Sequence, residues 1–119
     1  VRGQYTGAAA MTLGMALWEE FKYNEKDSVY EHASLTDYKV PRALDMPPIE
    51  NVIIEDVVEH PLDTGGPYGA RGAGEPAAVC VVASIANAIY NATGVRMRQS
   101  PMTAEKVLET MQFERPKKK

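Results

Sequence analysis

The chain has 119 residues, a formal net charge of −3 and one cysteine, which is the size and composition of an ordinary single globular domain. The single cysteine, Cys80, excludes an internal disulfide and a cysteine-based metal cluster, and it favours a reducing, cytoplasmic compartment. The mild acidity argues against nucleic acid as the main partner, because nucleic-acid binding needs a concentrated basic face. We recognise no signal-peptide pattern and expect no apolar run long enough to span a bilayer.

The first predicted element is a helix over residues 7–20, which are rich in Ala, Met and Leu. Apolar residues cover most of its circumference, which is typical of a buried helix rather than a surface helix. Gly3 and Gly7 are one helical turn apart, and Gly14 follows two turns later, so another backbone can approach closely. We therefore expect this helix to lie inside a larger body.

The middle of the chain is predicted to be rich in loops, with short strands. Residues 22–50 are polar, and their prolines exclude regular helix nearby. Short strand candidates lie at 29–30 and 32–35, and residues 51–58 (NVIIEDVV) have the β-branched composition and partial alternation of a strand. Residues 59–74 form a long Gly/Pro loop, and a loop of this length in a compact domain is usually functional.

The last part of the chain is predicted to be helical. Residues 76–93 form a long helix, with Pro76 in its first turn and Gly94 just past its end. Thr103 is placed to cap a short amphipathic helix, and residues 113–119 are expected to be a frayed tail. The inward-facing side chains of that final helix are predicted to be Val107, Leu108 and Met111.

The predicted fold class is therefore α+β: two long helices, a short strand region between them and a C-terminal helix. Residues 1–119 show no internal repeat and no domain boundary. We expect them to form a single portion of a larger domain.

The stretch with the clearest chemical content is GARGAGEP, residues 69–76, in which a glycine-rich loop carries one carboxylate to a predicted helix start. Glycines let backbone approach a ligand, and free N–H groups at a helix start favour anions. Glu75 suits a general base that must stay ionised; the alternative is an ordinary first-turn acid, which stabilises a helix by up to about 1 kcal/mol. Arg71 fits a phosphate ligand and a plain loop arginine equally well. The glycine order matches neither a dinucleotide fingerprint nor a Walker loop.

Other polar or reactive residues have structural explanations. Gln4 could donate its amide to the edge of a heterocycle, but a polar residue at a helix start is the simpler interpretation. His32 and His60 lie far apart without the spacing of metal ligands, and Cys80 is expected to pack as a small hydrophobe. No residue of this chain is predicted to ligate a metal.

Five segments, in order and with compatible gaps, resemble one known family. They are GQxxG with LGMALWEE, then LTDYKVPRALDMPPIE, GPYGARGAGEP, SIANAIYNATGVR and SPMTAEKVL, and together they run from Gly3 to about Leu108. In these segments the chain resembles the C-terminal part of the molybdenum-cofactor-binding large subunit of the xanthine dehydrogenase/aldehyde oxidase family of molybdenum hydroxylases. Two positions depart from the family pattern: Met11-Thr12 stands where many members have Gln-Gly, and Arg71 stands where Lys or Ser is common.

The resemblance implies roles for the loop and for the first helix. Glu75 matches the active-site glutamate, a base that takes a proton from an oxygen ligand of molybdenum while water-derived oxygen is transferred to an sp² carbon. The substrate implied is an aldehyde or an N-heterocycle such as a purine. The cofactor-binding residues implied are Gln4, Gly69, Ala70, Arg71, Gly72, Ala73 and Gly74.

The resemblance also predicts an oxidoreductase that works only when assembled, with an inactive isolated chain. Molybdopterin would be shared with the remainder of the molybdenum subunit, while iron–sulfur clusters and FAD would lie in partner domains or subunits. Nucleic acid and membrane are not expected as partners, and the compartment is expected to be cytoplasmic. The alternative is a catalytically silent assembly module, or a diverged fragment of the family, that docks through exposed apolar helices.

Overall fold

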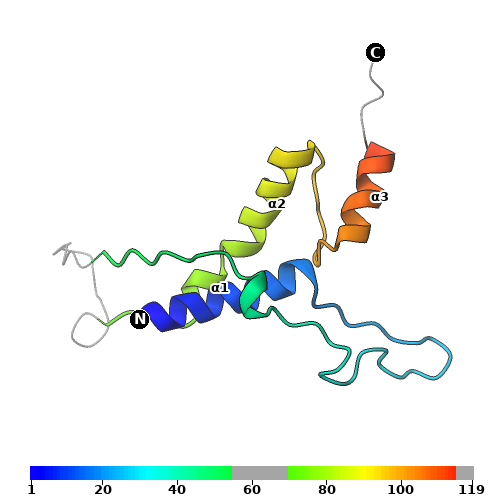
Figure 1. The fold of residues 1–119 in the computed structure, drawn as a ribbon, viewed down its shortest axis with the longest axis horizontal. Helices are drawn as coiled ribbons and strands as arrows, with labels where there is room; N and C mark the ends of the chain where they lie inside the picture. The colour runs from blue at the N-terminus through cyan, green and yellow to red at the C-terminus, as the bar shows by residue number, and fades with distance from the viewer. Residues whose placement is uncertain (55–69, 115–119) are drawn as a thin grey trace, which may run out of the picture.

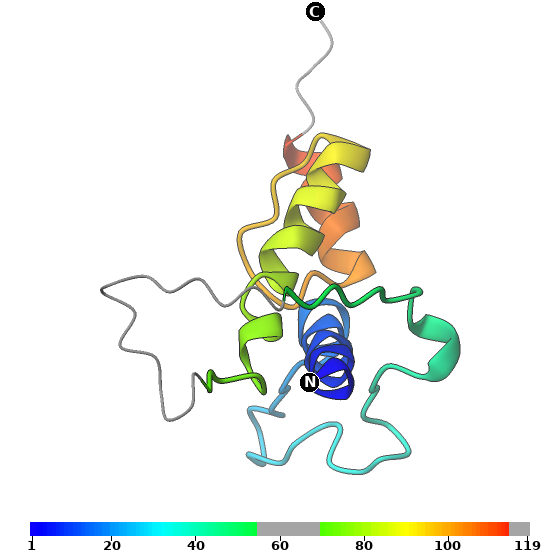
Figure 2. The same ribbon diagram turned by 90° about the vertical axis from the view of Figure 1, so that its left-hand side faces the viewer.

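The computed structural model describes residues 1–54 and 70–114. In these ranges the elements are the α-helices α1 (Arg2–Leu17), α2 (Val81–Thr93) and α3 (Ala104–Glu114) and the short 3₁₀ helices η1 (Ala43–Asp45) and η3 (Pro76–Ala78). Helix α1 lies across one side of the molecule, and α2 and α3 rise from it side by side (Figures 1 and 2). The described chain that follows α1, up to residue 54, loops away from the end of α1 and then returns along it (Figure 1).

Helix α1 is surrounded by other parts of the chain because the residues it buries are small. These residues are Ala8, Thr12, Gly14 and Ala16. The tightest approach is at Gly14, where a Cβ atom would overlap Oε1 of Glu19 and would lie 2.7 Å from Cδ and 2.9 Å from Cγ of Pro41. The predicted close approach is therefore confirmed at Gly14, whereas nothing lies within 4 Å of a Cβ built at Gly3 or Gly7.

The hydrophobic core of the described chain lies where the C-terminal end of α1 meets the segment between α2 and α3. Its buried members are Ala16, Val95, Met97 and Met102. The Met102 N–H donates to the Ala16 carbonyl (2.6 Å), and the Ser100 hydroxyl donates to the Met15 carbonyl (3.0 Å). Half-buried side chains of α2 and α3 pack on this cluster, so one short segment joins all three helices.

The ends of the later helices agree with the sequence. Gly94 closes α2 in the left-handed conformation (φ 77°), with its N–H donating to the Tyr90 carbonyl (2.7 Å). The Thr103 hydroxyl accepts the Lys106 N–H (3.4 Å) at the start of α3, as expected for a cap. Val107 and Met111 are half-buried as predicted, but Leu108 is 56% exposed, so its predicted inward orientation is wrong for this chain.

The single helix predicted over residues 76–93 is in fact two elements. The Ala78 N–H donates to the Glu75 carbonyl (2.8 Å) and the Val79 N–H to the Pro76 carbonyl (3.4 Å), which is the i→i+3 pattern of a 3₁₀ helix. A turn at residues 79–80 follows, and α2 begins at Val81. The first α-helical turn is therefore not next to Glu75, where the sequence placed it.

No β-strand occurs in the described part of the chain. Residues 51–54 have no ladder partner there, and Tyr23 and Tyr30 form only an isolated antiparallel bridge. The strands predicted within 29–35 are absent, because nearby Asn and Asp side chains accept backbone N–H groups and stabilise turns instead. Residues 55–58 of the strand predicted at 51–58 lie outside the described residues. What is described is helical, so the α+β class is not supported by these ranges.

One described stretch, Pro76–Thr93, is long and apolar enough to cross a membrane by length and composition alone. This finding differs from the expectation that no run would qualify. The stretch is divided by the turn between η3 and α2, and α2 packs on the core cluster along one side. A single such stretch does not establish a membrane role.

The chain leaves much apolar surface uncovered. Its radius of gyration is 19.0 Å, whereas a compact domain of this length has about 13.5 Å. In the described ranges the buried hydrophobic residues are Ala8, Ala16, Val95, Met97 and Met102, and α2 contains no buried residue. Such a small core gives little margin over the conformational entropy lost on folding, so further contacts with other polypeptide are expected.

Replacing Gly14 by Ala is expected to destabilise the chain by about 1–3 kcal/mol, because the added methyl group would overlap the ring of Pro41. The loss is measured as a shift of the urea midpoint, followed by the far-UV circular dichroism of the helices. The matched variant Gly7→Ala meets open space and is expected to be neutral or stabilising by up to about 1 kcal/mol. Equal effects of the two substitutions would contradict the close packing at Gly14.

Docking of α3 on the segment that follows α1 is expected to weaken in acid. The Lys106 ammonium donates to the Glu20 carboxylate (2.5 Å) and lowers the pKa of Glu20 below its ordinary value of 4.5. A lowered folded-state pKa contributes stability that is complete above the unfolded value and is lost as the pH falls through the folded value. The side chains are 34% and 25% exposed, so the contribution is at most about 1 kcal/mol.

Glu20→Gln is expected to remove this part of the pH dependence of the urea midpoint between about pH 3 and 6. Glu109→Gln removes a charge from the exposed face of α3 and serves as the control. An unchanged acid limb in Glu20→Gln would show that the ion pair does not stabilise the folded state.

Candidate functional site

Glu75 stands at the junction between the glycine-rich loop and η3. It occupies the N-cap position with φ −100° and ψ −21°, and its side chain makes no capping hydrogen bond. The residue is exposed, and its main-chain carbonyl, rather than its carboxylate, accepts the first turn's hydrogen bond. The Glu75 carboxylate therefore does not cap η3 by a hydrogen bond, and the first α-helical turn after it begins only at Val81.

Gln4 lies beside this loop although it is about 70 residues away in the sequence. It is an exposed residue in the first turn of α1, and its Oε1 atom lies 3.8 Å from where a Cβ on Gly74 would be. Helix α1 and η3 are in contact, which fixes the loop against this end of α1. The fold thus brings together two of the residues that the resemblance assigned to cofactor binding.

The loop residues form the rest of this surface. Ala70, Arg71, Gly72 and Gly74 are exposed and Ala73 is half-buried, while Gly69 lies outside the described residues. Neither Gly72 nor Gly74 has a positive φ, and a Cβ on Gly72 would meet nothing within 4 Å. The chain's own backbone and packing do not require glycine at these two positions. The loop therefore presents bare backbone on an open face, an arrangement that suits close approach by a ligand.

An apolar groove of about 320 Å³ adjoins this region, between α1 and α2. Leu13 and Ile85 form part of its floor, and Ile49 closes one side. Ser84 lines the groove as well, but its hydroxyl already donates to the Cys80 carbonyl (2.9 Å). The groove offers carbon contacts and little polar chemistry, so it is not a catalytic pocket.

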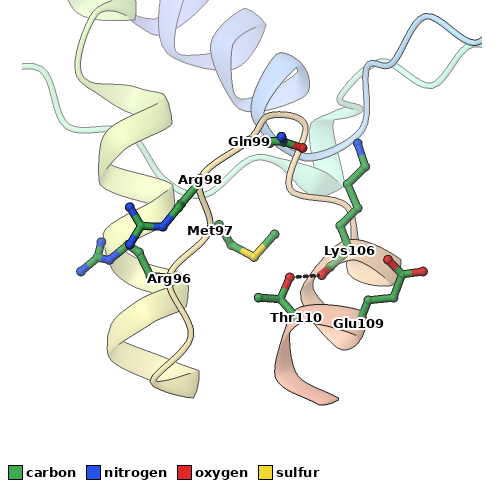
Figure 3. A pocket seen from close by; sticks show the side chains of 7 residues that line it. All are labelled: Arg96, Met97, Arg98, Gln99, Lys106, Glu109 and Thr110. Carbon is green, nitrogen blue, oxygen red and sulfur yellow. Dashed lines mark hydrogen bonds between the residues drawn. The ribbon is translucent and has the colours of Figure 1, made fainter. Parts of the chain in front are cut away.

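A second hollow, of about 350 Å³, lies between α3 and the segment that follows α2 (Figure 3). Figure 3 shows the guanidinium groups of Arg96 and Arg98 directed toward α2 and the Lys106 ammonium directed toward the end of α1. The Arg96 guanidinium also donates to Asn87 (2.7 Å) and lies 4.0 Å above the ring of Tyr90. The cations do not converge, so this hollow is not a built anion site.

The remaining candidates do not form a site. His32 and Cys80 are exposed, and His60 lies outside the described residues. The predicted packing of Cys80 as a buried hydrophobe is wrong for this chain. In the described ranges no group of three or more His, Cys, Asp or Glu side chains could hold a metal ion.

Comparisons with known proteins point to one family. Residues 1–47 match the family described as "Molybdopterin cofactor-binding domain". The chain is 36% identical over 110 residues to the aldehyde oxidoreductase molybdenum-binding subunit PaoC of Escherichia coli K12, covering 92% of this chain and 14% of that subunit. The crystal structure of quinoline 2-oxidoreductase from Pseudomonas putida 86 matches with a TM-score of 0.78 and 30% identity, over 97% of this chain and 14% of that one.

The chain belongs to the xanthine dehydrogenase/aldehyde oxidase family of molybdenum hydroxylases, as part of the molybdenum-binding subunit. A similar match, 36% identity over 107 residues, is found with the putative xanthine dehydrogenase molybdenum-binding subunit XdhA of Escherichia coli K12. The chain spans about one seventh of these relatives' length, since it covers 14% of each. This share accounts for the apolar surface that the described chain leaves exposed.

Two features of this family member could not be found from its sequence. The contact between Gln4 and the loop depends on how α1 and η3 pack, and no local pattern reports it. The groove beside Leu13 and Ile85 depends on the crossing of α1 and α2. The apolar character of both helices was the only available signal.

Alanine at Gly72 or Gly74 is expected to change the free energy of unfolding by less than about 0.5 kcal/mol, because the added methyl group meets open space or an ordinary contact. The urea midpoint should therefore stay nearly unchanged. Gly94→Ala is the control: φ is +77° there, so the loss is expected to exceed about 1 kcal/mol. A comparable loss at Gly72 would mean that the chain's own fold needs that glycine.

Proposed function

We propose that this chain supplies the active-site base and one wall of the molybdopterin site of a molybdenum hydroxylase. The observation that carries the proposal is the meeting of Gln4, from α1, with the loop that ends at Glu75 on one exposed face. In this proposal residues 1–119 are a single C-terminal portion of the molybdopterin-binding domain, and the isolated chain is inactive.

The residues present fit such a cofactor. The Gln4 amide can both donate and accept hydrogen bonds, as the edge of a pterin requires. The exposed backbone of residues 70–74 allows close approach, and a guanidinium such as that of Arg71 suits phosphate oxygens. Gly69 belongs to the same proposed wall. These groups line one side only, so the opposite side of the site must come from polypeptide outside this chain.

Glu75 is proposed to act as the general base. Its carboxylate is exposed and is not used as a helix cap, so it is available to accept a proton. When bound, the cofactor supplies the two-electron redox chemistry of the hydroxylation. Glu75 then receives the proton released as water-derived oxygen is transferred to an sp² carbon of the substrate.

The relatives support a proposed substrate class and proposed partners. Their names include aldehyde oxidoreductase and xanthine dehydrogenase, so an aldehyde or an N-heterocycle such as a purine is proposed as substrate. The proposed partners are the rest of the molybdenum subunit and iron–sulfur and flavin (FAD) domains or subunits that carry the electrons away. The proposed compartment is the cytoplasm, without nucleic-acid or membrane partners.

A catalytically silent assembly module is the second candidate function. It is favoured by the apolar groove and by exposed large side chains such as Leu44 and Val79, which suit docking whether or not chemistry takes place. The two candidates differ in what they require of Glu75. A docking module has no need of a carboxylate at the end of the glycine loop.

Glu75→Gln in the assembled enzyme is expected to lower the rate of hydroxylation by about 10²–10⁴-fold, because the amide cannot accept the proton. Molybdenum content, measured by metal analysis, is expected to be unchanged. Glu105→Gln, on the exposed first turn of α3, is the control and should keep full activity. Near-normal turnover of Glu75→Gln with bound cofactor would refute the proposed base. Natively purified protein that is metal-free and free of other polypeptides would support the docking module.

A further inference from the structure

Residues 49–54 show the alternating burial of a β-strand although they pair with nothing in the described chain. Every second residue is half-buried, and those between are exposed. The half-buried set is Ile49, Asn51 and Ile53, and the exposed set is Glu50, Val52 and Ile54. A period of two is the signature of an extended segment with one face against a protein body.

The inner face is held on α1. Ile49 packs over the groove beside Leu13, and the Asn51 side-chain amide donates to the Thr6 hydroxyl (2.9 Å). These contacts lie on α1 in the reverse order of the sequence, so the segment runs along α1 toward its N-terminal turn. Figure 1 shows this course, with the chain after η1 passing along α1 toward the end that is marked N.

The outer face and the backbone are uncovered. Val52 is 76% exposed and Ile54 is 82% exposed, and both are β-branched residues that favour strands. No backbone hydrogen bond joins residues 49–54 to another segment of the described chain. Pro47 and Pro48, which lack N–H groups, stand immediately before the segment and limit any pairing on that side.

We propose that residues 49–54 are an edge strand that receives a β-strand from the rest of the molybdenum-binding subunit. Strand addition would satisfy the free backbone groups and cover Val52 and Ile54. The occupant is assigned to the same subunit because the chain covers only 14% of its relatives. Its own core is also too small to close this face.

The added strand would lie next to the candidate site. Asn51 is anchored to Thr6, which is two residues from Gln4 in the first turns of α1. Pairing at residues 49–54 would therefore bring polypeptide from the rest of the subunit to the N-terminal end of α1, which carries Gln4. In the proposed site, this is where the opposite wall is missing. The inference rests on the proposed function, in which this chain is a portion of a larger molybdenum-binding subunit. It does not require Glu75 to be the base.

Hydrogen exchange at single-residue resolution tests the proposal. Amide exchange rates are compared between the chain alone and the chain in complex with the polypeptide that completes its subunit. Amides of alternate residues in 49–54 should exchange about ten-fold more slowly or better in the complex, since alternate N–H groups face an added strand. Amides in the middle of α1 are hydrogen-bonded in both samples and serve as the internal control. Val52→Pro and Ile53→Pro test one parity each, and the substitution at the parity that gains protection should weaken association more than the other and more than Val52→Ala.

A complex that forms without added protection in either parity overturns the strand but leaves the proposed function intact. Failure of the chain to associate with the subunit at all overturns both proposals. Alternate protection in the chain alone, together with a dimeric mass, would assign the edge to a second copy and overturn the proposed occupant. Glu75→Gln should give the same exchange pattern as the wild type, which separates this test from the catalytic one.

Discussion

The structure depends on how closely other parts of the chain approach α1. Its buried positions carry small side chains, and at Gly14 the ring of Pro41 lies where a side chain would otherwise be. This approach lets the wrapping segment cross α1 and return along it. The C-terminal end of α1 carries the core, through the Ala16–Met102 hydrogen bond, and its N-terminal turn carries the candidate site. The same helix contacts both α2 and η3, so it links the core to the candidate site.

The candidate site and the exposed surface have the same cause. Gln4 and the loop before Glu75 form an open surface, while the groove beside α2 and side chains such as Leu44, Ile54 and Val79 leave apolar surface uncovered. A self-contained enzyme would close its pocket and bury such surface. Both features are expected of one seventh of a molybdenum-binding subunit, in which the remaining polypeptide closes the site and covers the helices.

The region between the helices shows why the predicted strands do not form in the described chain. Residues 51–54 have β-branched composition and alternating burial, yet no ladder forms because the described chain offers no second strand. Pairing is a property of two segments, whereas the alternation is a property of one. The predicted α+β class is therefore not supported by the described chain, because a strand tendency in one segment forms a sheet only with a second segment.

The sequence by itself determined the features that depend on a few neighbouring residues. The Gly94 stop, the Thr103 cap and the family resemblance of the Glu75 loop all follow from local side-chain chemistry and order. Tertiary structure alone decided that Gln4 meets Gly74, that Leu108 faces solvent and that the helix after Glu75 is interrupted. These outcomes depend on packing between segments far apart in the chain, and the free energy of such packing is not encoded in any single window of residues.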